Sequence, residues 1–190
     1  MTIASSKRIF YKEYKDFGIP FYRSKEIIEL SNTGKTNSEL FISEERFNEI
    51  STEHGSPQKG DILLTSVGTL GKSYRVKEND LFYFKDGNLT WFKEYDELNS
   101  DIVYAWLNSD LGQNALREIT IGSTQSALTL TGLRNIELSI PPIEVQEKLN
   151  SQLKLIYEKN DTNYLQIQTL EKLRDTLLPK LMSGEVRVNL

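Results

Sequence analysis

The feature that most constrains the fold is a long stretch near the C-terminus, where residues 143–181 contain no glycine and only one proline, Pro179. Side chains recur along it at alternating spacings of four and three residues for more than four heptads. That spacing is typical of the a and d positions of a coiled coil. We call these positions the seam: Leu149, Leu153, Ile156, Asn160, Asn163, Ile167, Leu170, Arg174, Leu177 and Leu181.

The seam predicts one helix of about 36 residues, roughly 54 Å long at 1.5 Å per residue. A helix of that length needs a partner to cover its apolar side chains, and we expect self-association. Packing of the seam within the same chain is the alternative. A buried asparagine, as at Asn160 or Asn163, costs stability but fixes register and partner number. The alternative is that these polar seam positions face water, and that Tyr157 and Tyr164 form the contact with the partner helix.

Residues 1–142 differ in texture, because they are rich in aromatic and β-branched residues, Gly, Ser and Thr. The chain thus divides into a domain at 1–142 and a helix with its tail at 143–190, and the fold class is α+β. Within the first part the patterns predict strands at 62–67, 72–76 and 136–140, a hairpin of 81–84 with 89–92, and a helix over 101–111. That helix would be capped by Ser100 or Asp101 and end near Gly112.

Composition excludes several classes of protein. Apolar residues make up 38% and charged residues 26%, as in a folded soluble protein. The absence of cysteine excludes disulfides and cysteine-ligated metals, and favours the cytoplasm. No apolar run is long enough to span a membrane, and no signal peptide is expected.

The net charge of −4 argues mildly against nucleic acid, but the charges are unevenly distributed. Residues 1–37 carry seven Lys or Arg against four Asp or Glu, and residues 59–77 carry four against one, so each block is +3. Residues 78–118 carry three against nine, which gives −6. Such a dipolar chain can present a positive face to phosphates. The alternative is that these blocks are ordinary solvated surface.

No catalytic motif is found. His54 is the only histidine, and without cysteine it cannot build a usual zinc site. Phosphate-binding loops, dinucleotide fingerprints and nucleophile elbows are absent, and the Gly68–Gly71 loop has the wrong spacing for a phosphate loop. We therefore expect no catalytic centre, no metal and no cofactor.

Five stretches, in order, resemble the specificity subunit of type I restriction–modification systems. Together they run through most of the chain, and five motifs in the family's order are specific. They are GIPFYRSKEII (18–28), KGDILLTSVGTLG (59–71), GSTQSAL (122–128), LSIPPIEVQ (138–146) and LLPKLMSGEVR (177–187).

The resemblance implies a non-catalytic subunit with two target-recognition domains, each followed by a conserved helix, the two helices pairing as an antiparallel spacer. Each domain reads one half of a split DNA target, and the subunit holds methyltransferase (M) subunits and optionally restriction (R) subunits. This chain is similar to half of such a subunit, so two copies could rebuild the whole by two-fold symmetry. The family's usual Trp-containing stretch before this start is missing, which leaves open a natural half-subunit, a trimmed chain or a C-terminal fragment.

Duplex DNA is read by polar side chains at bases and by cations at phosphates. The candidates for DNA contact lie in loops of the basic blocks and near the glycines at 68, 71 and 122. They are Lys7, Arg8, Arg23, Lys25, Lys35, Thr36, Asn37, Thr69, Lys72, Ser123, Thr124 and Gln125. Two rivals stay open: a nuclease or complete enzyme, which the missing motifs disfavour, and a scaffold or decoy that engages the methyltransferase without reading DNA.

Overall fold

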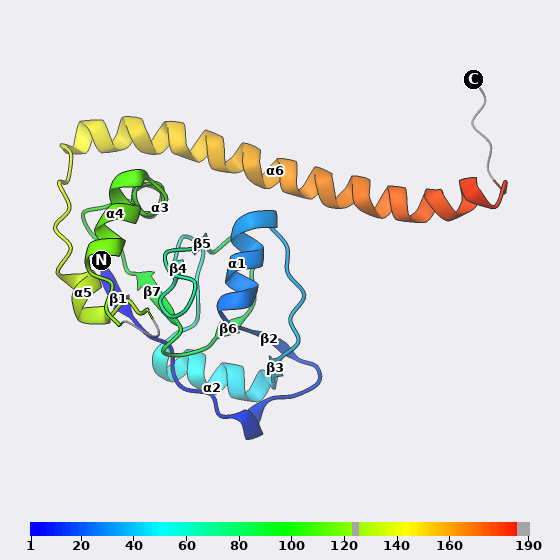
Figure 1. Cartoon of the computed structure of the whole chain (residues 1–190), viewed down its shortest axis with the longest axis horizontal. Coiled ribbons are helices and arrows are strands. Elements are labelled where there is room, and N and C mark those ends of the chain that lie inside the picture. The colour runs from blue at the N-terminus through cyan, green and yellow to red at the C-terminus, as the bar shows by residue number, and fades with distance from the viewer. Residues whose placement is uncertain (123–125, 186–190) are drawn as a thin grey trace. The chain divides into compact units, whose positions relative to one another are not determined.

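The computed structural model describes residues 1–122 and 126–185. Within them the chain forms seven strands, one 3₁₀ turn and six α-helices (Figure 1). The strands are β1 (Thr2–Ala4), β2 (Ile19–Tyr22), β3 (Phe41–Ile42), β4 (Ile62–Thr65), β5 (Ser73–Arg75), β6 (Tyr83–Phe84) and β7 (Leu89–Lys93). The helices are η1 (Tyr11–Glu13), α1 (Ser24–Thr33), α2 (Glu44–His54), α3 (Ser100–Leu107), α4 (Asp110–Glu118), α5 (Leu130–Arg134) and α6 (Ile143–Met182).

The strands form two small sheets. The first has four strands in the order β1-β7-β4-β5, and all its neighbours are antiparallel. The second has the order β3-β2-β6, in which β2 pairs antiparallel with β3 and parallel with β6. Together with the helices they confirm the predicted mixed α+β class.

The strand β4 is buried on both faces, which explains its continuous apolar run. Ile62 and Leu64 join a cluster with side chains of α3, α4 and α5. Leu63 points to the other face, because side chains alternate along a strand, and it joins a cluster with α1. The third cluster, around Phe21 and Ile50, joins the second sheet to α2. The predicted strands at 62–67 and 72–76 are confirmed as β4 and β5.

The predicted hairpin is wrong. Residues 83–84 and 89–93 are strands, but β6 pairs with β2 and β7 pairs with β4 and β1. Residues 85–88 therefore cross from one sheet to the other. The reason is that Tyr83 and Phe84 are both fully buried, so β6 is held by non-local packing that its own alternation does not encode.

The predicted helix over 101–111 is two helices. Asn99, not Ser100 or Asp101, caps α3, and Ser109 caps α4 by accepting from Gly112 N. Gly112 lies inside α4, and a Cβ there would come 2.0 Å from the Trp106 carbonyl oxygen. The glycine thus permits a tight corner between the helices and does not end one.

The predicted strand at 136–140 is wrong, because these residues form no strand. Ile136 and Leu138 alternate with exposed neighbours because they line a cavity beside β1. The long helix is confirmed: α6 runs from Ile143 to Met182, 40 residues, against the roughly 36 predicted from the seam. Gln146 is buried in its first turn and donates to the Pro141 carbonyl across 3.0 Å.

Contacts divide the chain into two compact units, Met1–Leu153 and Lys154–Leu190. The first eleven residues of α6 belong to the first unit and the remainder of the helix to the second. A division after residue 142 remains the prediction from sequence.

Candidate nucleic-acid interface

One end of the four-stranded sheet gathers several loops. Thr65, the last residue of β4, pairs with Leu89, the first of β7, and Ala4 at the end of β1 pairs with Trp91. The chain therefore leaves β1 and β4, and enters β7, at the same end of the sheet. We call the loops there the loop edge: residues 5–8, 66–72, 85–88 and 126–128.

The Gly68–Gly71 loop is held against the 126–128 segment. Gly68 N donates to the Ser126 carbonyl across 3.3 Å, and Val67 and Ala127 form an antiparallel bridge. At its base, Lys72 N donates to Thr65 Oγ1 across 3.0 Å. The structure thus brings two predicted loops together and leaves the side chains of Thr69 and Lys72 exposed.

The segment after β1 is tied to the loop before β7. Gly87 N donates to Ser5 Oγ across 3.2 Å. Arg8 Nε lies 2.8 Å from Asp86 Oδ2, and its side chain is 68% exposed. Lys7 is exposed, and its amide donates to the Tyr83 hydroxyl across 3.0 Å. Both predicted cations therefore lie on the loop edge.

The loop edge carries a positive charge. It holds Lys7, Arg8, Lys72 and Lys85 against the single carboxylate of Asp86, so four positive charges against one negative give +3. Lys85 and Asn88 were missed by the sequence analysis. Only the pairing of β4 with β7 places them there, although the Lys-Asp-Gly-Asn turn signalled a loop.

Arg23 and Lys25 are engaged by carboxylates. Arg23 binds the buried Glu26 across 2.6 Å and Glu39 across 3.0 Å, and Lys25 binds Glu39 across 2.7 Å. The hydrogen bond to Glu26 is the main cause that raises the pKa of Arg23, and Lys25 is the main cause that lowers the pKa of Glu39. Much of this positive charge is thus balanced within the domain.

The remaining predicted contacts are scattered. Ser24 Oγ lies 3.5 Å from the Asn88 carbonyl, which puts the start of α1 beside the loop edge. Lys35, Thr36 and Asn37 follow the end of that ten-residue helix, roughly 15 Å away at 1.5 Å per residue. Ser123, Thr124 and Gln125 lie outside the described residues.

The apolar seam residues are at least partly exposed along α6. Ile156, Ile167 and Leu170 are 55%, 49% and 63% exposed. A run of such side chains on one helix is a surface that another chain can cover. Pairing through the seam remains a prediction.

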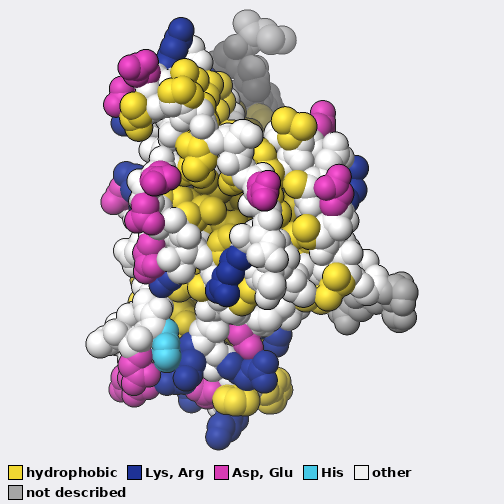
Figure 2. All heavy atoms as spheres, turned by 90° about the vertical axis from the view of Figure 1, so that its left-hand side faces the viewer, with side chains coloured by type: hydrophobic (Ala, Val, Ile, Leu, Met, Phe, Trp, Pro, Cys, Tyr) yellow, Lys and Arg dark blue, Asp and Glu magenta, His cyan; other side chains and the backbone are white. Residues whose placement is uncertain are grey.

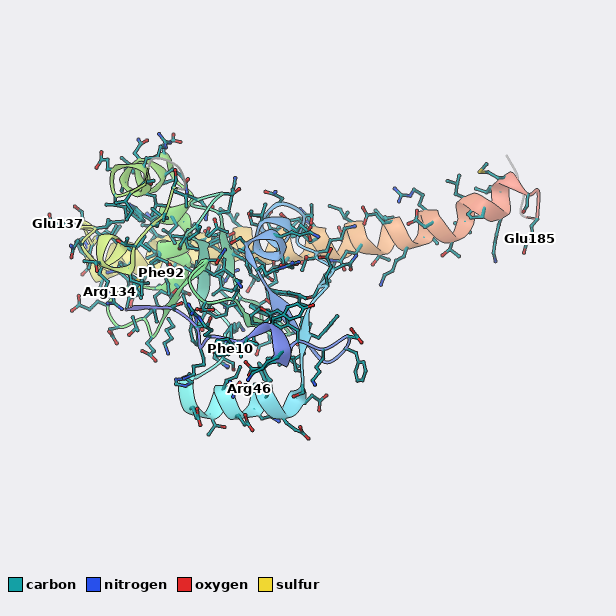
Figure 3. All side chains as sticks on the ribbon, turned by 60° about the horizontal axis from the view of Figure 1, so that its bottom comes forward. Phe10, Arg46, Phe92, Arg134, Glu137 and Glu185 are labelled. Carbon is teal, nitrogen blue, oxygen red and sulfur yellow. The ribbon has the colours of Figure 1, made fainter. Side chains whose placement is uncertain are left out.

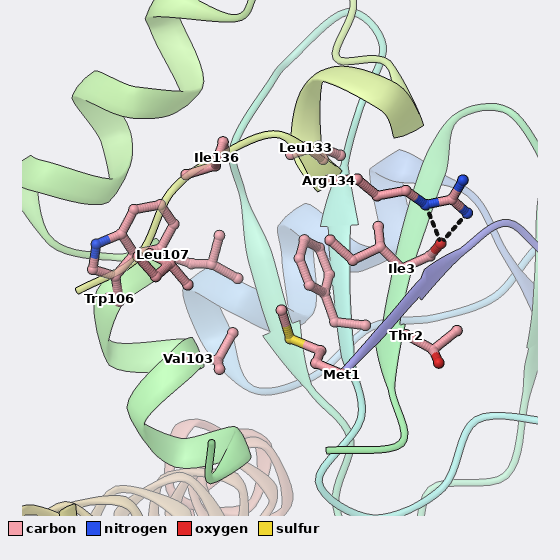
Figure 4. A pocket seen from close by; sticks show the side chains of 11 residues that line it. Met1, Thr2, Ile3, Val103, Trp106, Leu107, Leu133, Arg134 and Ile136 are labelled. Carbon is pink, nitrogen blue, oxygen red and sulfur yellow. Dashed lines mark hydrogen bonds between the residues drawn. The ribbon is translucent and has the colours of Figure 1, made fainter. Parts of the chain in front are cut away.

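A cavity of about 370 Å³ beside β1 offers no catalytic arrangement. Figure 2 shows the apolar hollow of this face, and Figure 4 shows its lining, which includes Trp106, Val103 and Ile136. Its one charged side chain, Arg134, donates to the Ile3 carbonyl through Nε at 3.2 Å and Nη2 at 2.6 Å. The guanidinium thereby satisfies a backbone carbonyl of β1, which is an edge strand of the sheet.

Within residues 1–122 and 126–185, no group of three or more His, Asp or Glu side chains is placed to hold a metal ion. No helix in the same ranges has both the length and the hydropathy that a membrane crossing requires.

Comparison with known proteins agrees with the resemblance seen in the sequence. The model of the type I restriction modification DNA specificity domain matches residues 1–172. The Haemophilus influenzae protein S.HindORF215P, named as a type I restriction enzyme specificity subunit, is 30% identical over 149 residues, which cover 76% of this chain and 35% of that protein. The MjaIX specificity subunit of Methanocaldococcus jannaschii is 40% identical over 67 residues, 35% of this chain and 16% of that subunit.

Solved structures share the fold. The type I restriction–modification S subunit from M. genitalium has a TM-score of 0.64 at 18% identity, over 96% of this chain and 43% of that one. The HsdS subunit from Thermoanaerobacter tengcongensis has a TM-score of 0.54 at 16% identity, over 97% and 43%. The chain thus spans less than half the length of each of these proteins.

Proposed function

The chain belongs to the family of type I restriction–modification DNA specificity domains, and we propose that it reads one part of a split duplex-DNA target with its loop edge. The observation that carries the proposal is the gathering of four loops with a net charge of +3 at one end of a rigid sheet. Loops on a rigid scaffold are where binding residues concentrate.

The side chains of the loop edge divide by chemistry. Lys7, Arg8, Lys72 and Lys85 are suited to phosphates, which fix the register of a protein on DNA. Thr69 and Asn88 offer the hydroxyl and amide groups that read base edges. The open main chain at Gly68, where an added Cβ would meet nothing within 4 Å, allows a phosphate to approach closely.

We propose that the chain performs no chemistry and directs methyltransferase subunits, and optionally restriction subunits, to its target. Family membership supports this, because the matched relatives are named specificity subunits of restriction enzymes. The sequence also lacks a phosphate-binding loop, a dinucleotide fingerprint and a nucleophile elbow.

Two copies of the chain pair through the seam of α6. The exposed side chains of Ile156, Ile167 and Leu170 support this pairing. A pair related by a two-fold axis presents two identical recognition units, so the target of a homodimer is an interrupted palindrome. A second recognition half supplied by another chain gives an asymmetric target instead.

A scaffold or decoy that engages the methyltransferase without reading DNA is the second candidate. The balanced charges around Arg23 and Lys25 favour it, since those cations are already paired. Substituting Lys7, Arg8, Lys72 and Lys85 together with glutamine separates the two. A scaffold still assembles and functions after that change, whereas a DNA reader assembles but loses its target.

The deciding experiment co-expresses the chain with a type I methyltransferase subunit from the same genome and maps methylated bases by direct sequencing of the DNA. A symmetric interrupted motif supports recognition, partnership and homodimerisation together. An asymmetric motif supports recognition but replaces the homodimer with a mixed pair. An intact complex without methylation contradicts recognition and favours the decoy.

A further inference from the structure

Three large aromatic side chains stand in solvent on the segment that follows the loop edge. Phe10, Tyr11 and Phe17 are 57%, 88% and 82% exposed. We call residues 10–17 the aromatic loop. Single exposed apolar residues are ordinary on protein surfaces, but three exposed aromatic rings within eight residues of one segment are more than that and suggest a binding role.

The middle of the aromatic loop is fixed to the domain by contacts of Glu13 and Tyr14. Glu13 Oε2 accepts from Phe10 N across 2.7 Å, and Glu13 Oε1 accepts from Arg46 Nε of α2 across 2.8 Å. Figure 3 shows Phe10 on the same side of the domain as Arg46, which belongs to α2. The Tyr14 ring packs 5.2 Å from the buried Phe21 ring, centroid to centroid.

The two ends are also fixed. Ile9 is buried in the cluster that joins the second sheet to α2, and Lys15 N donates to the Phe41 carbonyl across 2.9 Å. The exposure of Tyr11 and Phe17 is thus a feature of an ordered loop. A ligand that covers them meets rings whose backbone needs little further ordering.

Cations alternate with the exposed rings. Lys7, Lys12 and Lys15 are exposed and form no ion pair within residues 1–122 and 126–185. Asp16 belongs to the same loop and Glu44 lies beside it, whereas Glu13 is engaged by Arg46. Lys7 and Arg8 join the aromatic loop directly to the positively charged loop edge, and the aromatic loop itself is neutral, with Lys12 and Lys15 against Glu13 and Asp16.

We propose that Tyr11 and Phe17 stack on bases of the duplex and act as a wedge that opens a base step and distorts the DNA; this rests on the proposed function. Aromatic rings beside cations provide both base stacking and phosphate neutralisation. Apolar wedges between base steps kink duplexes in other proteins. A protein partner, which exposed aromatic rings also suit but neighbouring lysines do not, is a separate outcome of the test below.

The test uses the whole chain in its methyltransferase complex and a short duplex with the motif from methylation mapping. The duplex carries dyes at its ends and a fluorescent adenine analogue in the motif. The variants are Tyr11→Ala with Phe17→Ala, and Tyr11→Phe with Phe17→Tyr, which keeps both rings. Leu111→Ala is the matched control, since Leu111 is an apolar side chain 74% exposed on α4.

The proposal expects the alanine pair to bind roughly tenfold more weakly and to lose both the end-to-end shortening and the unstacking signal. The ring-keeping pair and the control behave as the parent. Unchanged affinity and unchanged signals in the alanine pair overturn the wedge and leave the proposed function standing. Loss of methyltransferase association, with DNA binding intact, overturns the wedge in favour of a protein contact. A parent complex that binds no DNA overturns the proposed function itself.

Discussion

The indole Nε1 of Trp91 donates a hydrogen bond to the Asp61 carboxylate across 2.8 Å, and both residues are buried. The same oxygen, Asp61 Oδ2, accepts from Gln58 N across 2.9 Å. The pair joins the turn that opens β4 to the neighbouring strand β7. The Lys59-Gly60-Asp61 part of the family motif therefore holds the fold together at the end of β4 opposite the loop edge.

This pair predicts a pH dependence of stability. Burial is the main cause that raises the pKa of Asp61 above its ordinary value of 3.8, against the opposing hydrogen bonds from Gln58 and Trp91. The folded chain then binds the proton more tightly than the unfolded chain, so the stability from Asp61 is fully present below 3.8 and is lost as the pH rises through the folded pKa. Urea unfolding across acid and neutral pH should show the parent losing stability relative to Asp61→Asn as the pH rises. A constant difference between the two proteins would contradict the assignment.

Gly18, the first residue of another family motif, predicts a large loss of stability on substitution. Its φ is +132°, and an added Cβ would lie 2.4 Å from the Ile42 carbonyl oxygen on the paired strand. Gly18→Ala should destabilise the chain by about 3 kcal/mol or more. Gly87→Ala is the control, because Gly87 also has a positive φ, +72°, but open space around it. That change should cost only about 1–2 kcal/mol. Equal unfolding midpoints for the two variants would rule out the steric argument.

The elements that were predicted correctly are those whose burial leaves a periodic pattern in their own sequence. The run that became β4 and the seam that became α6 were found because burial on both faces and a repeating helical face leave direct patterns in the sequence. The hairpin failed because Tyr83 and Phe84 pair with β2, whose residues are some sixty positions earlier in the chain. The predicted helix end near Gly112 was wrong because, in the sequence, a glycine that permits close helix packing cannot be distinguished from one that ends a helix.

The candidate site was predictable only in part, for the same reason. Lys7, Arg8, Thr69 and Lys72 were selected from charge and glycine spacing, and the structure places them on one loop edge. Lys85 joins them through the register of β7 against β4, which no local pattern reveals. The carboxylate partners of Arg23 and Lys25 were equally hidden, because Glu39 reaches them across a loop.

The positive loop edge predicts a change in the salt dependence of DNA binding. Lys7→Gln with Lys72→Gln removes two cations suited to phosphates, so the slope of log K against log salt should become shallower by roughly 2. Fluorescence anisotropy over a salt series measures this slope. Lys59→Gln with Lys148→Gln is the matched control, since Lys59 lies at the opposite end of β4. An equal change in both double variants would mean that net charge, and not the loop edge, sets the affinity.

The seam predicts which face of α6 carries self-association. Leu170 lies on the seam and is 63% exposed, whereas Leu165 lies off it and is 65% exposed. The two leucines thus differ in helical position and hardly in exposure or chemistry. Leu170→Asp places a charge in the contact and should shift the chain toward monomer at least tenfold, because an unpaired buried charge is costly. Leu165→Asp should leave the association constant near that of the parent.

Sedimentation equilibrium on the parent and the two variants distinguishes the faces of α6. Equal weakening by both aspartates would mean that the helix associates through a broader surface than the a and d positions, and association that survives Leu170→Asp would mean that the seam faces water.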